Sequence, residues 1–220
     1  MSKGTDITIE EARELVADRG LWPLARDFFW DFAPQIHPSW LLGIEGFGKC
    51  DADLTSSPRV KRYVLDALGV EPCFQMLPKG DVARLLLQNG TTLESLAKWF
   101  GALAFADGLR RVTNGATVRE LKAALPGIYP EVFGYTAYFA ELTSPLEGEM
   151  PSAQGIVEEG VQMLFGLFEG LPDVILRRLE LKLPMSFDGL RHSPPRRGIK
   201  MSAVVKLLKL KFPEAYSTCC

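Results

Sequence analysis

Apolar side chains recur every three or four positions along most of the chain, which is the spacing of one face of an α-helix. Residues 199–212 carry the clearest stripe, formed by Met201, Val204, Val205, Leu208 and Phe212. Leu207 and Leu210 lie off that stripe, so their side chains meet either more core or a partner. The pattern predicts a mainly α fold, a bundle of about nine to ten helices.

Capping signals mark several helix starts. In a capping box, a Thr hydroxyl accepts a hydrogen bond from a backbone N–H, and a Glu carboxylate three residues later reaches back to the Thr N–H. Thr91–Glu94 and Thr117–Glu120 fit this motif, and Asn114 is expected to end the helix that begins near Thr91. Inside that helix, Gly101 either bends the chain or lets a second helix approach closely.

One segment departs from the helical spacing. Leucines at positions 179, 181 and 183 alternate with Glu180 and Lys182, and this two-residue period is typical of a half-buried strand. The same residues also fit the end of a helix that starts after Pro172. Two interpretations therefore stay open for Leu179–Leu183. The segment is either a short strand or hairpin, or the end of a helix.

The chain has 220 residues, of which 47% are hydrophobic and 24% charged, a composition typical of a globular domain with its own core. A loop rich in Pro, Gly and Ser, residues 143–155, is short enough to connect two helices within one domain. We predict a single helical domain over residues 1–220. It comprises N-terminal helices in residues 1–31, a Pro-rich loop at 185–198 and a basic C-terminal helix at 199–212.

Charge is distributed unevenly along the chain. From Arg177 onward there are ten Lys or Arg and three Asp or Glu, a net charge of +7, whereas the residues before Arg177 carry −9. Such a basic end attracts an acidic protein face, acidic lipid or nucleic acid, or it balances the acidic part of its own domain as a solvated surface. Nucleic acid is not expected, because few aromatic residues are interleaved with the basic ones to stack on bases.

The residues that usually carry chemistry are scarce. Two histidines, His37 and His192, are too few for a zinc site when the cysteines are scattered. The cysteines are Cys50, Cys73, Cys219 and Cys220. They suggest no disulfide framework and favour a reducing compartment. Because a signal peptide and an apolar run of about 18 residues are also missing, we expect a cytoplasmic protein with no enzymatic activity, cofactor or metal.

Residues Gly43–Cys50 match the phosphate-binding loop G-x-x-x-x-G-K-[ST] except at the last position. Cys50 replaces the hydroxyl that would bind Mg²⁺, and two acidic residues and a proline follow where a helix should open. A glycine-rich surface turn is the expected structure. A nucleotide-binding enzyme remains an alternative function, as does an electrostatic binder of acidic lipid or nucleic acid.

Three stretches, taken in order, resemble one family. The first is FAPQIHPSWL at residues 32–41, the second runs over residues 96–145 and includes GLRR at 108–111, and the third is RRLELKLP at 177–184. A Pro-rich loop and a basic helix ending in Lys-Phe-Pro at 211–213 follow the third stretch. Together they resemble the SctK (YscK-like) family, accessory proteins of the cytosolic sorting platform of bacterial type III secretion injectisomes.

The resemblance implies a mainly helical, non-enzymatic adaptor for protein transport in virulence. Such an adaptor bridges the SctD-type cytoplasmic domain of the inner-membrane ring protein and the SctQ-type pod protein. It works at the cytoplasmic face of the inner membrane without inserting into it, and it takes no small-molecule substrate.

Two segments are the candidate partner-binding regions of this adaptor, an aromatic segment that contains Pro and His and the basic end of the chain. Their candidate residues are Phe32, Pro34, His37, Trp40, Arg177, Arg178, Lys182, Arg196 and Arg197. For the first segment, the alternative interpretation is a buried turn in which Phe32 and Trp40 pack into the core.

Overall fold

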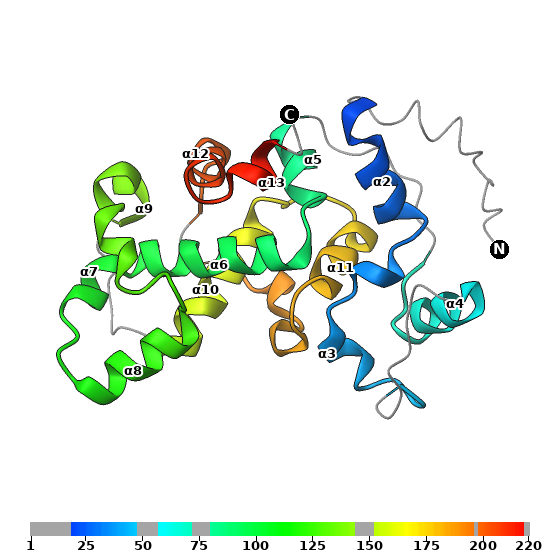
Figure 1. Cartoon of the computed structure of the whole chain (residues 1–220), viewed down its shortest axis with the longest axis horizontal. Coiled ribbons are helices and arrows are strands. Elements are labelled where there is room, and N and C mark those ends of the chain that lie inside the picture. Colours follow the sequence, from blue (N-terminus) through cyan, green and yellow to red (C-terminus); the bar gives the residue numbers. More distant parts are fainter. Residues whose placement is uncertain (1–18, 48–56, 72–79, 144–151, 196–197, 218–220) are drawn as a thin grey trace. The chain divides into compact units, whose positions relative to one another are not determined.

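The structure, a computed structural model, describes five stretches of the chain, residues 19–47, 57–71, 80–143, 152–195 and 198–217 (Figure 1). The regular secondary structure of these stretches consists of α-helices and 3-10 helices, and none of the five contains a strand. The prediction of a mainly α fold is therefore confirmed. Among the described helices, none is both long enough and apolar enough to cross a membrane.

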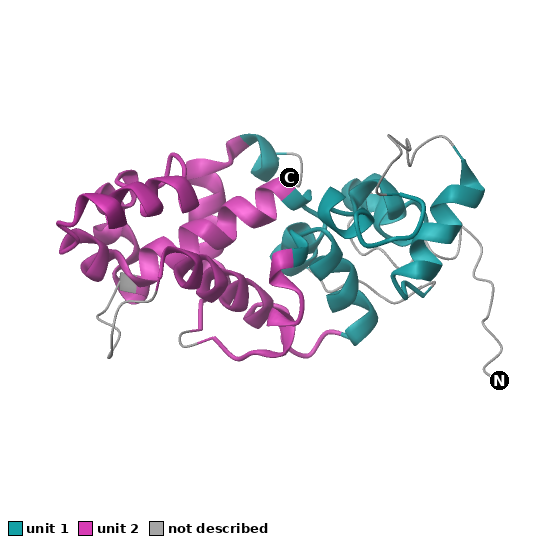
Figure 2. Cartoon of the chain, turned by 90° about the horizontal axis from the view of Figure 1, so that it is seen from below, with its two compact units in different colours: residues 1–90, 172–185, 214–220 teal, residues 91–171, 186–213 magenta. Residues whose placement is uncertain are grey.

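The chain divides into two compact units (Figure 2). Unit 1 comprises residues 1–90, 172–185 and 214–220, and unit 2 comprises residues 91–171 and 186–213. Each unit has buried apolar side chains, such as Phe28 and Leu179 in unit 1 and Leu96 and Leu164 in unit 2. A single domain over residues 1–220 stays a prediction.

Unit 1 contains helices that are distant in sequence. They are η1 (Arg19–Leu21), α2 (Trp22–Phe29), η2 (Ala33–Gln35), α3 (Pro38–Leu41), α4 (Pro58–Ala67), α5 (Asp81–Leu86), α11 (Asp173–Leu181) and most of α13 (Pro213–Ser217). Because α11 runs to Leu181, the helix-end interpretation of Leu179–Leu183 is correct and the strand is wrong. The alternation was misleading because the polar residues in it, Glu180 and Lys182, are buried together with the leucines.

Unit 2 holds most of the remaining helices. They are α6 (Gly90–Ala104, whose first residue belongs to unit 1), α7 (Ala106–Arg110), α8 (Gly115–Ala124), η3 (Glu131–Gly134), η4 (Thr136–Phe139), α9 (Ala140–Thr143), α10 (Ala153–Gly166), η6 (Leu190–His192) and α12 (Met201–Lys211). Another short helix, η5 (Met185–Phe187), spans the boundary between the units. The Pro-rich loop thus contains two 3-10 turns, and Arg196 and Arg197 lie outside the described residues.

Helices α6 and α10 approach each other at glycines. A Cβ atom on Gly160 would overlap the carbonyl oxygen of Ala97, and a Cβ atom on Gly101 would overlap the carbonyl oxygen of Ile156. Gly101 therefore permits close approach, the second of its two predicted roles. The break between α6 and α7 falls instead at Phe105, whose φ of −107° and ψ of 15° depart from helical geometry.

Helix α8 starts earlier than the capping box predicted. Asn114 is its N-cap, because the Asn114 side-chain oxygen accepts a hydrogen bond of 2.8 Å from the Ala116 N–H. The expectation that Asn114 ends the preceding helix and that Thr117 begins the next one is wrong. Asn is as good an N-cap as Thr, and here it satisfies an orphan N–H three residues before the predicted box could do so.

The buried face of α12 is rotated relative to the predicted stripe. The buried residues are Ala203, Val204, Leu207 and Leu208, whereas Val205 is half-buried and Leu210 is exposed. Leu207 thus joins the core, as one of the two interpretations proposed. Leu210 stays on the surface.

Candidate partner-binding site

Two of the three stretches that carry the family resemblance meet in unit 1. The backbone N–H of His37 donates to the Leu181 carbonyl at 2.8 Å, and the Met185 N–H donates to the Ser39 hydroxyl at 2.8 Å. Helix α3 consequently lies against the C-terminal end of α11 and the residues that follow it (Figure 1). The candidate residues at 32–41 and 177–182 therefore form one site, which their separation in sequence did not indicate.

His37 positions α3. Its Nδ1 accepts a hydrogen bond of 3.2 Å from the Ser39 backbone N–H, so the imidazole is the N-cap of the helix, and Pro38 is well suited to the first helical position. The Ser39 hydroxyl lies 2.8 Å from the same nitrogen and donates to it, because that nitrogen is already an acceptor. The histidine is thus a turn residue bonded to backbone.

Trp40 is buried under Arg177. The indole N–H donates to the Leu183 carbonyl at 2.8 Å, and the Arg177 guanidinium carbon lies 4.8 Å from the ring centroid, within the range of a cation–π contact. Arg177 also pairs with the buried Glu180 carboxylate, with 2.6 Å between Nη1 and Oε2. Arg177 thus covers both the aromatic ring and the carboxylate, and it keeps part of its side chain exposed.

Arg178 is almost fully buried and binds the end of α2. Its Nη1 donates to the Phe28 carbonyl at 2.5 Å, and its Nη2 donates to the Glu71 carbonyl at 2.9 Å. The guanidinium also lies 5.1 Å from the centroid of the Phe32 ring. Because the last carbonyls of a helix have no partner within the helix and carry its partial negative charge, a cation at this position stabilises α2.

Lys182 binds the end of α5 in the same manner. Its Nζ donates to the carbonyls of Leu86 and Gln88 at 3.1 and 2.9 Å, and it lies 4.8 Å from the centroid of the Phe28 ring. Burial, and to a smaller extent the positive charge of Arg178, together lower the pKa of Lys182 from 10.5 to about 7. Near neutral pH the amine is therefore only partly protonated.

The candidate residues fall into two groups by exposure. Phe32, Trp40, Arg178 and Lys182 each expose less than 5% of their surface, and we call these four residues the buried framework. The alternative interpretation, a buried turn that packs Phe32 and Trp40, describes their observed positions. Pro34 is exposed, and His37 is half-buried. A role in partner binding stays a prediction for every candidate residue.

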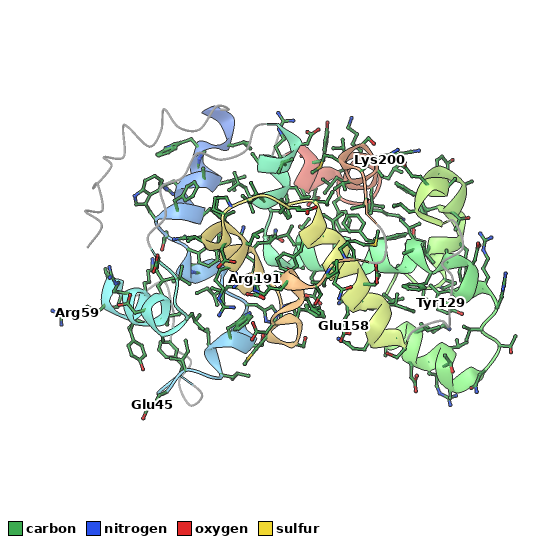
Figure 3. All side chains as sticks on the ribbon, turned by 180° about the vertical axis from the view of Figure 1, so that it is seen from behind. Glu45, Arg59, Tyr129, Glu158, Arg191 and Lys200 are labelled. Atoms are coloured by element: carbon green, nitrogen blue, oxygen red, sulfur yellow. The ribbon has the colours of Figure 1, made fainter. Side chains whose placement is uncertain are left out.

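Accessible apolar side chains border the buried framework. Leu42, directly after α3, is 74% exposed, and Met185 and Tyr63 are also exposed. Tyr63 donates from its hydroxyl to the Glu45 carbonyl at 3.2 Å, and its ring stacks on Phe47 with 6.1 Å between centroids. Residues 42–47 form a turn after α3, and Glu45 lies at the tip of this turn (Figure 3). No sequence signal marks these residues as exposed, because an exposed apolar side chain has the same pattern as a buried one.

The glycine-rich motif begins in this turn. Gly43 follows α3, a helix, whereas a phosphate-binding loop follows a buried strand. Gly46 has a φ of 88°, as a turn requires. Lys49 and Cys50 lie outside the described residues. The described part of the motif therefore has the geometry of a surface turn.

In the part of the chain that the structure describes, no group of three or more His, Cys, Asp or Glu side chains could hold a metal ion. The site in unit 1 is instead built from aromatic rings, cations and backbone carbonyls. These contacts hold α3 in a fixed position against the end of α11.

A family model described as YOP proteins translocation protein K (YscK) matches residues 30–220. The match includes residues 32–41, the whole of α11 and all of unit 2. Neither a search of curated proteins nor a search of solved structures found a match.

Proposed function

The chain belongs to the YscK family, the SctK proteins of type III secretion, and from this premise we propose that it is a non-enzymatic adaptor of the injectisome sorting platform. In this role one surface binds the SctD-type cytoplasmic domain of the inner-membrane ring protein, and another binds the SctQ-type pod protein. These two contacts hold the protein at the cytoplasmic face of the bacterial inner membrane.

The observation that carries the proposal is the extent of the family match, which covers residues 30–220 and therefore parts of both units. An adaptor needs two surfaces with distinct partners. Each unit exposes large apolar side chains, which are more common at protein interfaces than on other surfaces when they cluster. These residues are Leu42, Tyr63 and Met185 in unit 1, and Tyr138 and Leu210 in unit 2.

In this proposal the exposed and the buried candidate residues have different roles. Pro34, His37 and Arg177 keep exposed atoms and contact the partner of unit 1, together with Leu42 and Met185. The buried framework acts indirectly, because it fixes α3 against α11 and so lowers the conformational entropy lost on binding. Arg196 and Arg197 contribute positive charge toward an acidic partner.

A pull-down with each proposed partner tests the adaptor function. The tagged full-length chain is incubated separately with the ring protein's cytoplasmic domain and with the pod protein, each at about micromolar concentration. We expect both to be retained. Retention of neither partner would overturn the proposal, and retention of only one would reduce the protein from an adaptor to a subunit of one component.

A further inference from the structure

The outward face of α12 combines positive charge with exposed apolar surface. Ser202, Lys206, Lys209 and Leu210 are all exposed, and their spacing of four, three and one residues places them on one side of the helix. The opposite side carries the four buried residues of the core stripe. Leu210 is 47% exposed at a position where a helix with only one apolar face would place a polar residue.

Lys206 is held in place beside a second exposed apolar side chain. Its Nζ donates to the Tyr138 carbonyl at 2.8 Å, and it lies 5.5 and 5.4 Å from the ring centroids of Tyr138 and Phe139. Tyr138, at the end of the 3-10 helix η4, is 60% exposed. Leu210 lies one helical turn after Lys206, so both exposed apolar residues are neighbours of the same fixed cation. We call Tyr138, Lys206, Lys209 and Leu210 the α12 surface.

Two lysines near α12, Lys200 and Lys211, have carboxylate partners. Lys211 pairs with Glu131 and packs on the rings of Trp99 and Tyr135, at 4.8 and 4.0 Å from their centroids. Burial alone would lower the pKa of Lys211, but its contacts with Glu131 and Tyr135 raise it. Lys200, which is labelled in Figure 3 and lies just before α12, pairs with Glu141 at 3.3 Å.

Lys206 differs from these two lysines, because the oxygen that it binds belongs to a backbone carbonyl. The α12 sequence contains no Asp or Glu, so the helix itself supplies no compensating charge.

We propose that the α12 surface docks an acidic protein segment, a helix or loop in which carboxylates border an apolar side chain; this inference rests on the proposed function and locates one of the two partner contacts. Carboxylates of the partner meet Lys206 and Lys209, and its apolar side chain packs between Tyr138 and Leu210. Tyr is frequent among interface residues that contribute most to affinity. Since Lys206 is already fixed, binding costs less side-chain entropy than it would for a free lysine.

An acidic protein fits this surface better than an anionic membrane does. Recognition of anionic lipid typically uses clusters of about four to eight Lys or Arg, and the α12 surface offers two exposed lysines. Its two apolar side chains are both neighbours of Lys206, an arrangement that suits a partner with a defined shape.

Two double variants of the full-length chain test the proposal. Lys206→Glu with Lys209→Glu reverses the charge, and Tyr138→Ser with Leu210→Ser removes the apolar contacts. The matched control is Arg119→Glu with Lys122→Glu on α8, which makes the same charge change at two exposed positions of unit 2. Thermal unfolding of each variant checks that the fold is retained, as expected for exposed positions.

Affinity for the ring protein's cytoplasmic domain and for the pod protein is then measured for each variant by titration calorimetry. We expect both double variants to bind one and the same partner about tenfold or more weakly, because the first places like charges across the interface and the second removes its apolar contacts. The α8 control should bind as the unmodified chain does. Raising the ionic strength from about 0.1 to about 1 M should weaken this partner's binding to the unmodified chain more than to a Lys206→Gln, Lys209→Gln variant.

The outcomes separate this inference from the proposed function. If the unmodified chain binds both partners and the α12 variants bind them equally well, the inference is wrong and the adaptor function stands. If the unmodified chain binds neither partner, the proposed function itself fails. The inference is also overturned if the charge reversal abolishes only self-association of the chain, or only its binding to phosphatidylglycerol vesicles.

Discussion

Two basic side chains at the C-terminal end of α11, Arg178 in the helix and Lys182 at its C-cap, bind the ends of two other helices. Arg178 and Lys182 lie four residues apart, one helical turn, and both are buried. Arg178 binds the carbonyl of Phe28 at the end of α2, and Lys182 binds the carbonyl of Leu86 at the end of α5. Each hydrogen bond links a side chain near residue 180 to a helix that lies about 100 or more residues earlier in the chain. Arg178 and Lys182 therefore hold distant segments of unit 1 together.

Replacement of Lys182 by Met tests this arrangement through the dependence of stability on pH. Because the pKa of Lys182 is about 7 in the folded chain and 10.5 in the unfolded chain, the unfolded state binds more protons between these pH values. The Lys182 contribution to the free energy of unfolding therefore rises from pH 7 to pH 9, by about 2 kcal/mol.

Urea denaturation at pH 7 and pH 9 measures this difference. The unmodified chain should gain stability relative to Lys182→Met, whereas Lys122→Met, a change of an exposed lysine on α8, should leave the pH dependence as it was. An identical pH dependence in the unmodified chain and in Lys182→Met would show that the buried amine does not titrate in this range.

At the scale of helices, unit 2 depends on the close approach of α6 and α10. Gly101 and Gly160 supply the space, and carbonyl oxygens of the opposite helix occupy the positions that side chains would take. Glycine costs up to about 1 kcal/mol of helix propensity relative to alanine at each position. The packing of the two backbones must offset that cost.

Gly160→Ala is accordingly expected to destabilise the protein by about 2 kcal/mol or more, even though alanine is the better helix former. The new Cβ would overlap the Ala97 carbonyl and the Gly101 nitrogen, and the helices would have to separate. Gly115→Ala is the matched control, because nothing lies within 4 Å of its added Cβ at the start of α8. It should be neutral or slightly stabilising. A stabilised Gly160→Ala variant in chemical denaturation would contradict the close crossing.

Helical content was readable from the sequence, whereas several helix limits and faces were not. The capping box at Thr91 correctly predicted α6, and the three-to-four-residue spacing in residues 199–212 correctly predicted α12. The buried face of α12 differed from the predicted one, because Leu207 meets core that only the tertiary structure supplies. Asn114 was misassigned because the same residue type ends one helix and begins another.

At the scale of the whole molecule, the family resemblance predicted which stretches matter, and the structure adds how two of them are related. Residues 32–41 and 177–184 each carry motifs, yet no periodicity links segments so far apart in the chain. Their contact depends on hydrogen bonds such as that from the Trp40 indole to the Leu183 carbonyl. The burial of Arg178 and Lys182 could not be predicted from the sequence either, because a Lys or Arg is ordinarily a surface residue.

The adaptor account requires that the chain hold two proteins at the same time. The most direct measurement immobilises the ring protein's cytoplasmic domain and quantifies how much pod protein is retained with and without the full-length chain. We predict that the pod protein is retained only when the chain is present, in equal molar amounts with it. Retention of the pod protein without the chain, or displacement of the ring domain from the chain by the pod protein, would contradict the account.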